Sequence, residues 1–305
     1  MKKVFFAASF GIALLVGSVV TLSSCSDAEE VMNPEKQVVY APVSVQVSGF
    51  SVSMEDFPGT RAAVDPSSYT SVKRITLAFY DSNGTEIQKS TQIKNNASTY
   101  TTFGQFSCSL PVGNYTLVAV AYDFFDNDEF TLTSPTVAAF SSERVRETFC
   151  ATQSVAIIDA APQNLSITLN RINTKLTINS TDARPVGAIN VRTTYSAASK
   201  GFNPTTGLAT DANGFSVVNG LNQNVGALAV LANCAFIATD QQTMDITLEV
   251  LDGSNNVLCT KVVPNVPLRR NRVTVLEGQL FTPSSPSTAS FTIETQWLDD
   301  YTVTF

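Results

Sequence analysis

The stretch that decides the fold class is Val72-Lys73-Arg74-Ile75-Thr76-Leu77-Ala78-Phe79-Tyr80-Asp81-Ser82-Asn83-Gly84. From Ile75 to Phe79 every second residue is large and apolar, which is the period of a β-strand with one buried face. The pair Asn83-Gly84 favours a tight turn because both residues tolerate positive φ. We therefore expect a β-hairpin whose return strand covers residues 85–93.

The same two-residue period recurs along most of the chain. Val43, Val45 and Val47 alternate with polar residues, and a turn over 111–114 predicts a second hairpin from its flanking strands. Further strands are expected at residues 188–195, 227–237, 244–251 and 257–263. No helical period is sustained, although residues 139–149 are compatible with one short helix. Strands at this spacing with turns between them predict an all-β fold of the sandwich type.

The length of 305 residues predicts two domains behind an N-terminal leader. Pro162 marks the expected boundary, because a second β-rich unit opens at Leu165. The predicted segments are a signal peptide over 1–24, an acidic and polar tether over 25–42, β-sandwich domains over 43–162 and 163–282, and a Ser/Pro spacer with a C-terminal strand over 283–305.

The leader has the composition of a secretory signal. Two lysines precede an apolar run from Val4 to Val20, and Leu22-Ser23-Ser24-Cys25 follows it. An uncleaved transmembrane anchor is the alternative, since the run approaches the ~20 residues that span a bilayer. The four-residue ending instead resembles the lipobox of bacterial lipoproteins. That resemblance implies cleavage between Ser24 and Cys25, and attachment of fatty acyl chains such as palmitate to Cys25.

An acidic cluster, Asp27-Ala28-Glu29-Glu30, directly follows this cysteine. It resembles the export signal that sends lipoproteins of Bacteroidales-type bacteria to the outer face of the outer membrane. A solvated acidic linker is the plainer interpretation, since runs of charge are usually that. The leader and the cluster together predict an outer-membrane, lipid-anchored protein that faces the cell surface.

Composition excludes several classes of function. Without the leader the chain has 17 basic and 26 acidic residues, a net charge of −9, which disfavours nucleic acid as a partner because phosphate binding needs a basic patch. The sequence has no histidine, which excludes Ser-His-Asp and Cys-His catalysis and histidine zinc sites. We expect no enzymatic activity and no cofactor.

Four cysteines remain if Cys25 carries lipid. An even number in an exported protein suggests disulfides, and buried free thiols are the alternative. The local pairings we favour are Cys108 with Cys150 and Cys234 with Cys259.

One acidic loop offers a weak calcium candidate in Asp123, Asp126 and Asp128, because calcium prefers carboxylate and carbonyl oxygens. The pattern of an EF-hand is absent from it. A solvated acidic loop is the favoured interpretation, and we predict no metal site.

Several motifs follow one another in a recognisable order. They are the leader with its acidic cluster, Thr60-Arg61-Ala62, Leu110-Pro111-Val112-Gly113-Asn114-Tyr115-Thr116, Leu169-Asn170-Arg171-Ile172-Asn173-Thr174-Lys175-Leu176, and Val266-Pro267-Leu268-Arg269-Arg270-Asn271-Arg272-Val273-Thr274. In this order they resemble the fimbrillin family, the type V pilus subunits and anchors of Bacteroidales. The resemblance covers most of the mature chain and implies two tandem β-sandwiches of transthyretin-like, Greek-key topology.

The resemblance implies a processing site near the N-terminus. In stalk subunits of that family, an Arg-specific protease removes an N-terminal segment and opens a groove, which a strand of the neighbouring subunit fills. Here Arg61 and Ala62 would flank the cut. The alternative is an untouched surface arginine, since anchor-type members keep their N-terminus and, with it, the lipidated Cys25.

The C-terminus is the second candidate assembly site. Apolar residues of one parity recur there, at Phe291, Ile293, Trp297, Tyr301, Val303 and Phe305. They form either the last strand of the second domain or a strand donated to another subunit by β-augmentation.

The leading interpretation is a lipid-anchored fimbrial subunit or fimbrium anchor, which acts in pilus assembly and cell adhesion through β-strand contacts. Its expected partners are other fimbrial subunits, the outer membrane, and a host protein or glycan. The alternative is a surface glycan-binding lipoprotein of a nutrient-uptake system. Such a protein needs exposed aromatic platforms, so a cluster of Trp297, Tyr301 and Tyr122 on one exposed face would favour it.

Overall fold

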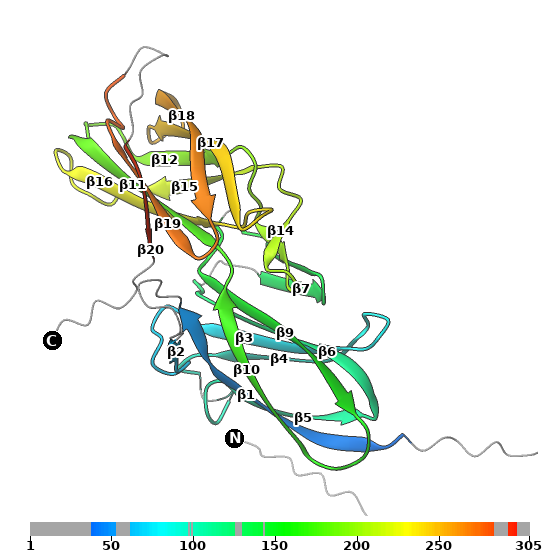
Figure 1. Cartoon of the computed structure of the whole chain (residues 1–305). Helices are drawn as coiled ribbons and strands as arrows, with labels where there is room; N and C mark the ends of the chain where they lie inside the picture. The colour runs from blue at the N-terminus through cyan, green and yellow to red at the C-terminus, as the bar shows by residue number, and fades with distance from the viewer. Residues whose placement is uncertain are drawn as a thin grey trace, which may run out of the picture. The chain divides into compact units, whose positions relative to one another are not determined.

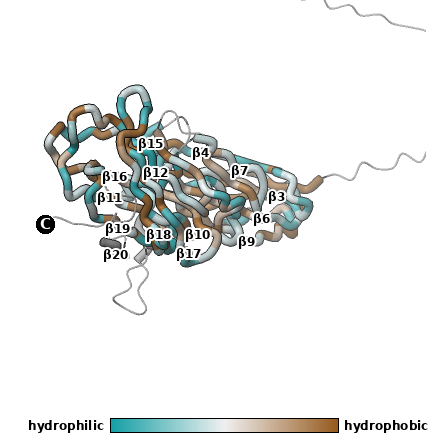
Figure 2. Tube along the Cα trace, turned by 90° about the horizontal axis from the view of Figure 1, so that it is seen from above, coloured by the Kyte–Doolittle hydropathy of each residue, from teal (hydrophilic) through white to brown (hydrophobic). Residues whose placement is uncertain are grey.

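The computed structural model describes residues 38–52, 62–96, 98, 100–125, 130–142, 144–283 and 292–297. All regular secondary structure in these residues is β-strand, so the prediction of an all-β fold is confirmed (Figure 1). Hydrophobic and hydrophilic residues alternate along many of these strands (Figure 2). Within the described ranges, no helix has the length and apolarity needed to cross a membrane.

The first sheet has eight strands and surrounds the first hydrophobic core. Its members are β1 (Tyr40–Val52), β2 (Ala62–Val64), β3 (Arg74–Tyr80), β4 (Glu86–Ile93), β5 (Gln105–Pro111), β6 (Gly113–Tyr122), β9 (Thr148–Ile157) and β10 (Gln163–Arg171). Their order is β2-β1-β10-β9-β6-β3-β4, with β5 also paired to β1. One end of this order contacts β5, because the buried Gln92 of β4 accepts a hydrogen bond from Gly104 N and donates one to Gln105 O at the start of β5.

The hairpin predicted at residues 75–93 is confirmed. β3 and β4 pair in antiparallel register, and Asp81 N donates to Thr85 O at 2.9 Å to close the turn. Gly84 has φ +78°, a conformation that glycine adopts without steric cost. The second predicted hairpin is wrong: β5 pairs with β1, whereas β6 pairs with β3 and β9. The turn over 111–114 therefore carries the chain across the core, and does not join neighbouring strands.

A second core lies between two four-stranded sheets. One sheet has the order β16-β11-β19-β20 and the other β15-β12-β17-β18. The strands are β11 (Thr174–Ala183), β12 (Asn190–Tyr195), β15 (Phe215–Gly220), β16 (Leu228–Ala235), β17 (Gln241–Leu251), β18 (Val257–Arg269), β19 (Arg272–Gly278) and β20 (Thr292–Trp297). The strands expected at 188–195, 227–237, 244–251 and 257–263 correspond to β12, β16, β17 and β18.

One strand lies in a different sheet from the one expected. The segment from Leu165 was predicted to open the second unit, but it belongs to β10, which pairs with β1 in the first sheet. Its side chains Ile167 and Leu169 lie in the first core. The chain enters the second sandwich only after Arg171, where β11 begins. Contacts group residues 38–305 into one compact unit. That the two halves fold independently, as two domains, stays a prediction.

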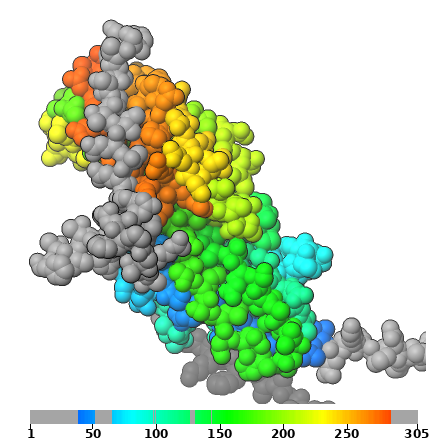
Figure 3. All heavy atoms as spheres, viewed as in Figure 1, coloured from blue at the N-terminus to red at the C-terminus, as the bar shows by residue number. Residues whose placement is uncertain are grey.

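A small fourth sheet joins the two sandwiches, with the order β14-β13-β8-β7. It consists of β7 (Phe130–Ser134), β8 (Val137–Phe140), β13 (Gly201–Asn203) and β14 (Leu208–Thr210). Below it Phe140, Phe202 and Phe236 pack in one cluster, with ring centres of Phe202 and Phe236 4.6 Å apart. The helix considered at 139–149 is wrong, because both ends of that segment are strands. In Figure 3 the green β9–β11 region and the yellow-to-orange β17–β19 region meet on one face.

A buried arginine connects the two sandwiches. Arg171, at the end of β10, has no exposed side-chain surface, and its Nη2 lies 2.6 Å from Glu147 Oε1 and 2.6 Å from the Tyr69 hydroxyl. Its Nη1 donates to Asn271 Oδ1 at 3.1 Å, and Asn271 lies in the β18–β19 turn of the second sandwich. The Arg171 guanidinium also lies 5.0 Å from the centre of the Phe149 ring. A buried charge needs such partners, because removing one leaves the charge uncompensated.

Two buried tyrosines provide a matched test of this network. Tyr69→Phe removes hydrogen bonds to two charged groups and should lower the free energy of unfolding by about 1.5–3 kcal/mol. Tyr195→Phe removes a hydroxyl that has no hydrogen-bond partner among the described residues. It should leave the free energy of unfolding unchanged or raise it by up to ~1 kcal/mol. Urea denaturation checks both variants, and equal losses would contradict the role given to Arg171.

Candidate functional site

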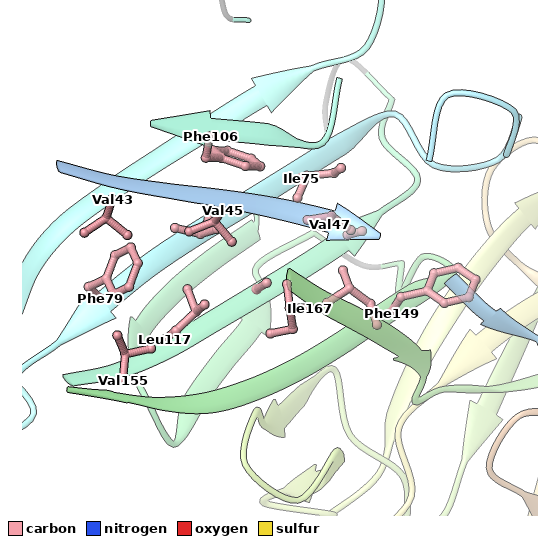
Figure 4. Packing of buried hydrophobic residues seen from close by; sticks show 14 of the residues in the cluster. Val43, Val45, Val47, Ile75, Phe79, Phe106, Leu117, Phe149, Val155 and Ile167 are labelled. Carbon is pink, nitrogen blue, oxygen red and sulfur yellow. The ribbon is translucent and has the colours of Figure 1, made fainter. Parts of the chain in front are cut away.

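The candidate site is the groove that β1 occupies in the first sandwich. Every inward side chain of β1 is between 0% and 2% exposed: Ala41, Val43, Val45, Val47 and Phe50. Figure 4 shows Val43, Val45 and Val47 projecting into the same interior as Phe79, Leu117 and Ile167. Burying an aliphatic or aromatic side chain contributes roughly 1.5–3 kcal/mol, so β1 is held mainly by its apolar face.

Backbone hydrogen bonds hold β1 on both edges. It runs parallel to β10 on one side, and antiparallel to β5 and β2 on the other. A register shift between Val47 and Gly49 changes the parity, so that Phe50 also points inward. The Phe50 ring packs on Tyr69 and Phe149, at 5.4 and 4.8 Å between ring centres. The end of β1 therefore contacts the same aromatic rings that surround Arg171.

The predicted processing site follows β1 directly in the sequence. Ala62 is the first residue of β2, and its backbone is paired with Val52 at the end of β1. Arg61 lies outside the described residues, as do Ser24 and Cys25 of the predicted lipidation site. A cut between Arg61 and Ala62 would therefore separate β1 covalently from the rest of the sheet.

The C-terminal candidate strand pairs within its own chain. β20 runs antiparallel to β19, from Arg272 opposite Trp297 to Glu277 opposite Thr292, at the edge of its sheet (Figure 1). Ile293 and Trp297 are members of β20, whereas Phe291, Tyr301, Val303 and Phe305 lie outside the described residues. This backbone pairing is the one expected if the segment forms the last strand of its own second sandwich. Donation of the strand to another subunit stays a prediction.

An aspartate fixes the start of the segment that leads to β20. Asp182 Oδ1 accepts a hydrogen bond from Leu280 N at 2.7 Å, and Oδ2 accepts from Phe281 N at 2.9 Å and Thr282 N at 2.7 Å. Partial burial raises the pKa of the Asp182 carboxyl, but these hydrogen bonds outweigh it and the pKa is lowered. The buried Lys261 donates to Thr282 O beside it. Nothing in the sequence around Asp182 indicated this role, because its partners lie about a hundred residues away.

The four remaining cysteines are free thiols. Cys108 packs against the first core, whereas Cys150 lies in the cluster between the sandwiches, so the two side chains belong to different interiors. Cys234 packs in that same cluster and Cys259 in the second core. Burial raises the pKa of Cys234 to about 12, so this thiol stays protonated near neutral pH. The structure thus has the free thiols of the alternative, with Cys150 buried and the other three partly buried, and the disulfide pairings stay a prediction.

The calcium candidate is only partly described. Asp123 forms an ion pair with Lys73 at 2.9 Å, while Asp126 and Asp128 lie outside the described residues. Among the residues that are described, no group of three or more carboxylate or cysteine side chains is arranged to hold a metal ion.

We predict a pH-dependent role for Asp182. Its lowered pKa means that the carboxylate stabilises the fold above the ordinary aspartate value of 3.8, and that this contribution is lost as the pH falls below it. Asp182→Asn should therefore speed hydrogen exchange of the amides of residues 280–282 at pH 7, and differ less from wild type near pH 3. Asp252→Asn, in the β17–β18 loop, is the control and should leave these amides unchanged. Equal exchange in wild type and Asp182→Asn at pH 7 would contradict the assignment.

Comparison with solved structures finds similar chains in other bacteria. A putative polysaccharide-binding protein (DUF1812) from Bacteroides thetaiotaomicron is 12% identical, with a TM-score of 0.50 over 85% of this chain and 99% of that one. A putative adhesin from Bacteroides ovatus is 12% identical, with a TM-score of 0.48 over 80% and 88%. The fimbrial anchor protein Mfa2 from Porphyromonas gingivalis is 12% identical, with a TM-score of 0.47 over 78% and 90%.

At this level of identity the likeness concerns the fold alone. A putative adhesin and a fimbrial anchor protein are among these neighbours. No curated protein matches the chain. The model of one sequence family matches residues 42–304, which is most of the chain. The chain therefore belongs to a family of unknown function, DUF6562.

Proposed function

We propose that the protein is a lipid-anchored component of a surface fimbrium, either a subunit or the anchor, which binds its neighbours through exchanged β-strands. The observation that carries this proposal is the placement of β1. It is the first strand among the described residues, its described inward side chains are buried, and the candidate cut at Arg61 lies between it and β2 in the sequence.

Removal of β1 would leave a groove of defined chemistry. β10 would lose a parallel partner, and β5 and β2 would lose an antiparallel one, which exposes two rows of backbone donors and acceptors. The pockets left by alternate side chains, such as Val43 and Val45, would accept the apolar residues of another extended strand. After a cut, β1 is held only by non-covalent contacts, so a competing strand of similar pattern can replace it.

The two roles differ in what happens to the N-terminus. A stalk subunit loses β1 and accepts a strand, so the lipid on Cys25 serves only to carry the chain to the surface. An anchor keeps β1 in its groove and stays attached through Cys25. In both roles the adhesion-type function follows from protein–protein contacts, without catalysis.

The glycan-binding alternative loses one of its three candidate residues. Tyr122 is 2% exposed and packs against Phe130 and Phe140, at 4.5 and 5.9 Å between ring centres. It therefore offers no face on which a sugar ring can stack.

Processing at Arg61 is tested by mass spectrometry of protein released from intact cells. We expect only two N-termini, an acylated Cys25 and a free Ala62, and Arg61→Lys should remove the second while keeping the charge. Arg269→Lys, at the exposed end of β18, is the matched control and should leave both unchanged. An Ala62 N-terminus that persists in Arg61→Lys would contradict the processing site.

Lipid anchoring is tested by Cys25→Ser. Each buried CH₂ group of an acyl chain contributes ~0.8 kcal/mol to membrane binding, so loss of the acyl chains should move the protein from the membrane to the soluble fraction. Cys108→Ser, which alters a thiol in β5, should leave the protein membrane-bound. Wild-type protein that is soluble in the periplasm with an unmodified Cys25 would contradict the anchor and the subunit roles alike.

A further inference from the structure

A polar cavity of about 260 Å³ lies where the chain between β8 and β9 crosses the second sandwich. This crossing segment, residues 144–147, spans the open side of the sandwich between its edge strands β15 and β16. Arg144 Nη2 donates to Val218 O of β15 at 2.8 Å, and Val145 forms a β-bridge with Cys234 of β16. The cavity is thus built by segments that are distant in sequence, and none of its lining residues belongs to β1.

The cavity carries positive charge that the described residues do not neutralise. Lys175, which is half-buried on β11, has no hydrogen-bond or ion-pair partner among them, and Arg144 has no carboxylate partner there. The two described carboxylates that line the cavity are already engaged. Asp123 pairs with Lys73 at 2.9 Å, and Glu147 pairs with Arg171 at 2.6 Å.

A third cation borders the same space. Arg146 lines the cavity, with its guanidinium 4.3 Å from the centre of the Phe125 ring. A guanidinium matches the geometry of a carboxylate and is weakly hydrated, so it suits recognition of that group better than an ammonium does. Lys175 of β11 adds a point charge to the lining. Cations from different elements around one small space favour a bound anion over a simple surface ion pair.

The cavity also contains an acceptor that lacks a donor. Asn219 Oδ1 on β15 is buried and has no hydrogen-bond partner among the described residues. Buried polar atoms are nearly always paired. Because this oxygen has almost no accessible surface, a donor from a ligand reaches it only when the Asn219 side chain turns toward the cavity. The other polar lining residues include Ser71 and Asn233. The ligand should therefore offer hydroxyl groups as well as negative charge.

We propose that this cavity binds one carboxylate-bearing sugar residue, a uronic or sialic acid, with Lys175 and Arg144 on the carboxylate and Asn219 accepting from a hydroxyl. The volume lies just below the roughly 300–1,000 Å³ of sites for drug-sized ligands, which suits a single ring. Charged and amide side chains line this space together with Val145, Val217 and Ala232, so one part of it suits polar groups and another the apolar face of a sugar ring. The proposal does not depend on strand exchange, because none of these residues belongs to β1, β2 or β20.

The test is isothermal titration of the full protein, purified from cell envelopes in detergent, with two probes that differ only in the carboxylate. Methyl glucuronide, or 2-O-methyl sialic acid, should bind, and methyl glucoside should bind at least tenfold more weakly. Lys175→Gln should weaken binding of the acidic sugar at least tenfold, and Lys175→Arg should restore most of it. Lys89→Gln, on β4 in the first sandwich, is the matched control and should leave the dissociation constant unchanged.

Three results would overturn the proposal. They are absence of binding of either acidic sugar at 10 mM in a correctly folded sample, equal binding of glucuronide and glucoside, and equal binding of a tripeptide with a free carboxylate. Arg144→Gln provides a second variant if Lys175→Gln fails to fold, and it should show the same selective loss. Strand exchange should be unaffected in these variants, so failure of this proposal is distinguishable from failure of the proposed function.

Discussion

The pairing of β1 with strands on both of its edges is the constraint on which the first sandwich depends. β10 enters the sheet beside β1 although the two strands are about 120 residues apart in the chain, and β5 and β2 depend on the opposite edge of the same strand. The apolar face of β1 also fills the centre of the core. A sheet assembled around its first strand cannot be complete without that strand or a substitute of the same pattern.

The position of β1 also affects the junction between the two sandwiches. Phe50, near the end of β1, packs on Tyr69 and Phe149, and these rings lie against the buried Arg171. Arg171 in turn reaches Asn271 in the second sandwich. The side chain at the Phe50 position therefore affects the packing of the junction between the two sandwiches. This holds for Phe50 of β1 and for the equivalent residue of a replacement strand.

Local patterns allowed part of this fold to be predicted from the sequence. The β3–β4 hairpin was predictable because its signal, alternation followed by Asn83-Gly84, lies within a dozen residues. The partners of β5 and β10 were not, because alternation tells which face of a strand is buried and not which strand lies beside it. The segment 139–149 was ambiguous because short apolar runs fit a helix or a strand equally well.

The candidate sites also divide into those that a local motif indicates and those that depend on contacts between distant parts of the chain. Cys25 and Arg61 were predicted because short motifs indicate their chemistry, and they stay predictions. Asp182 and Lys175 acquire their surroundings only when distant strands come together. The central claim is that β1 is a replaceable strand, and the most direct measurement is exchange of a fluorescent peptide of residues 40–52 into protein cut after Arg61. The account predicts stable incorporation after the cut and none before it. Exclusion of the peptide from cut protein that remains folded would contradict it.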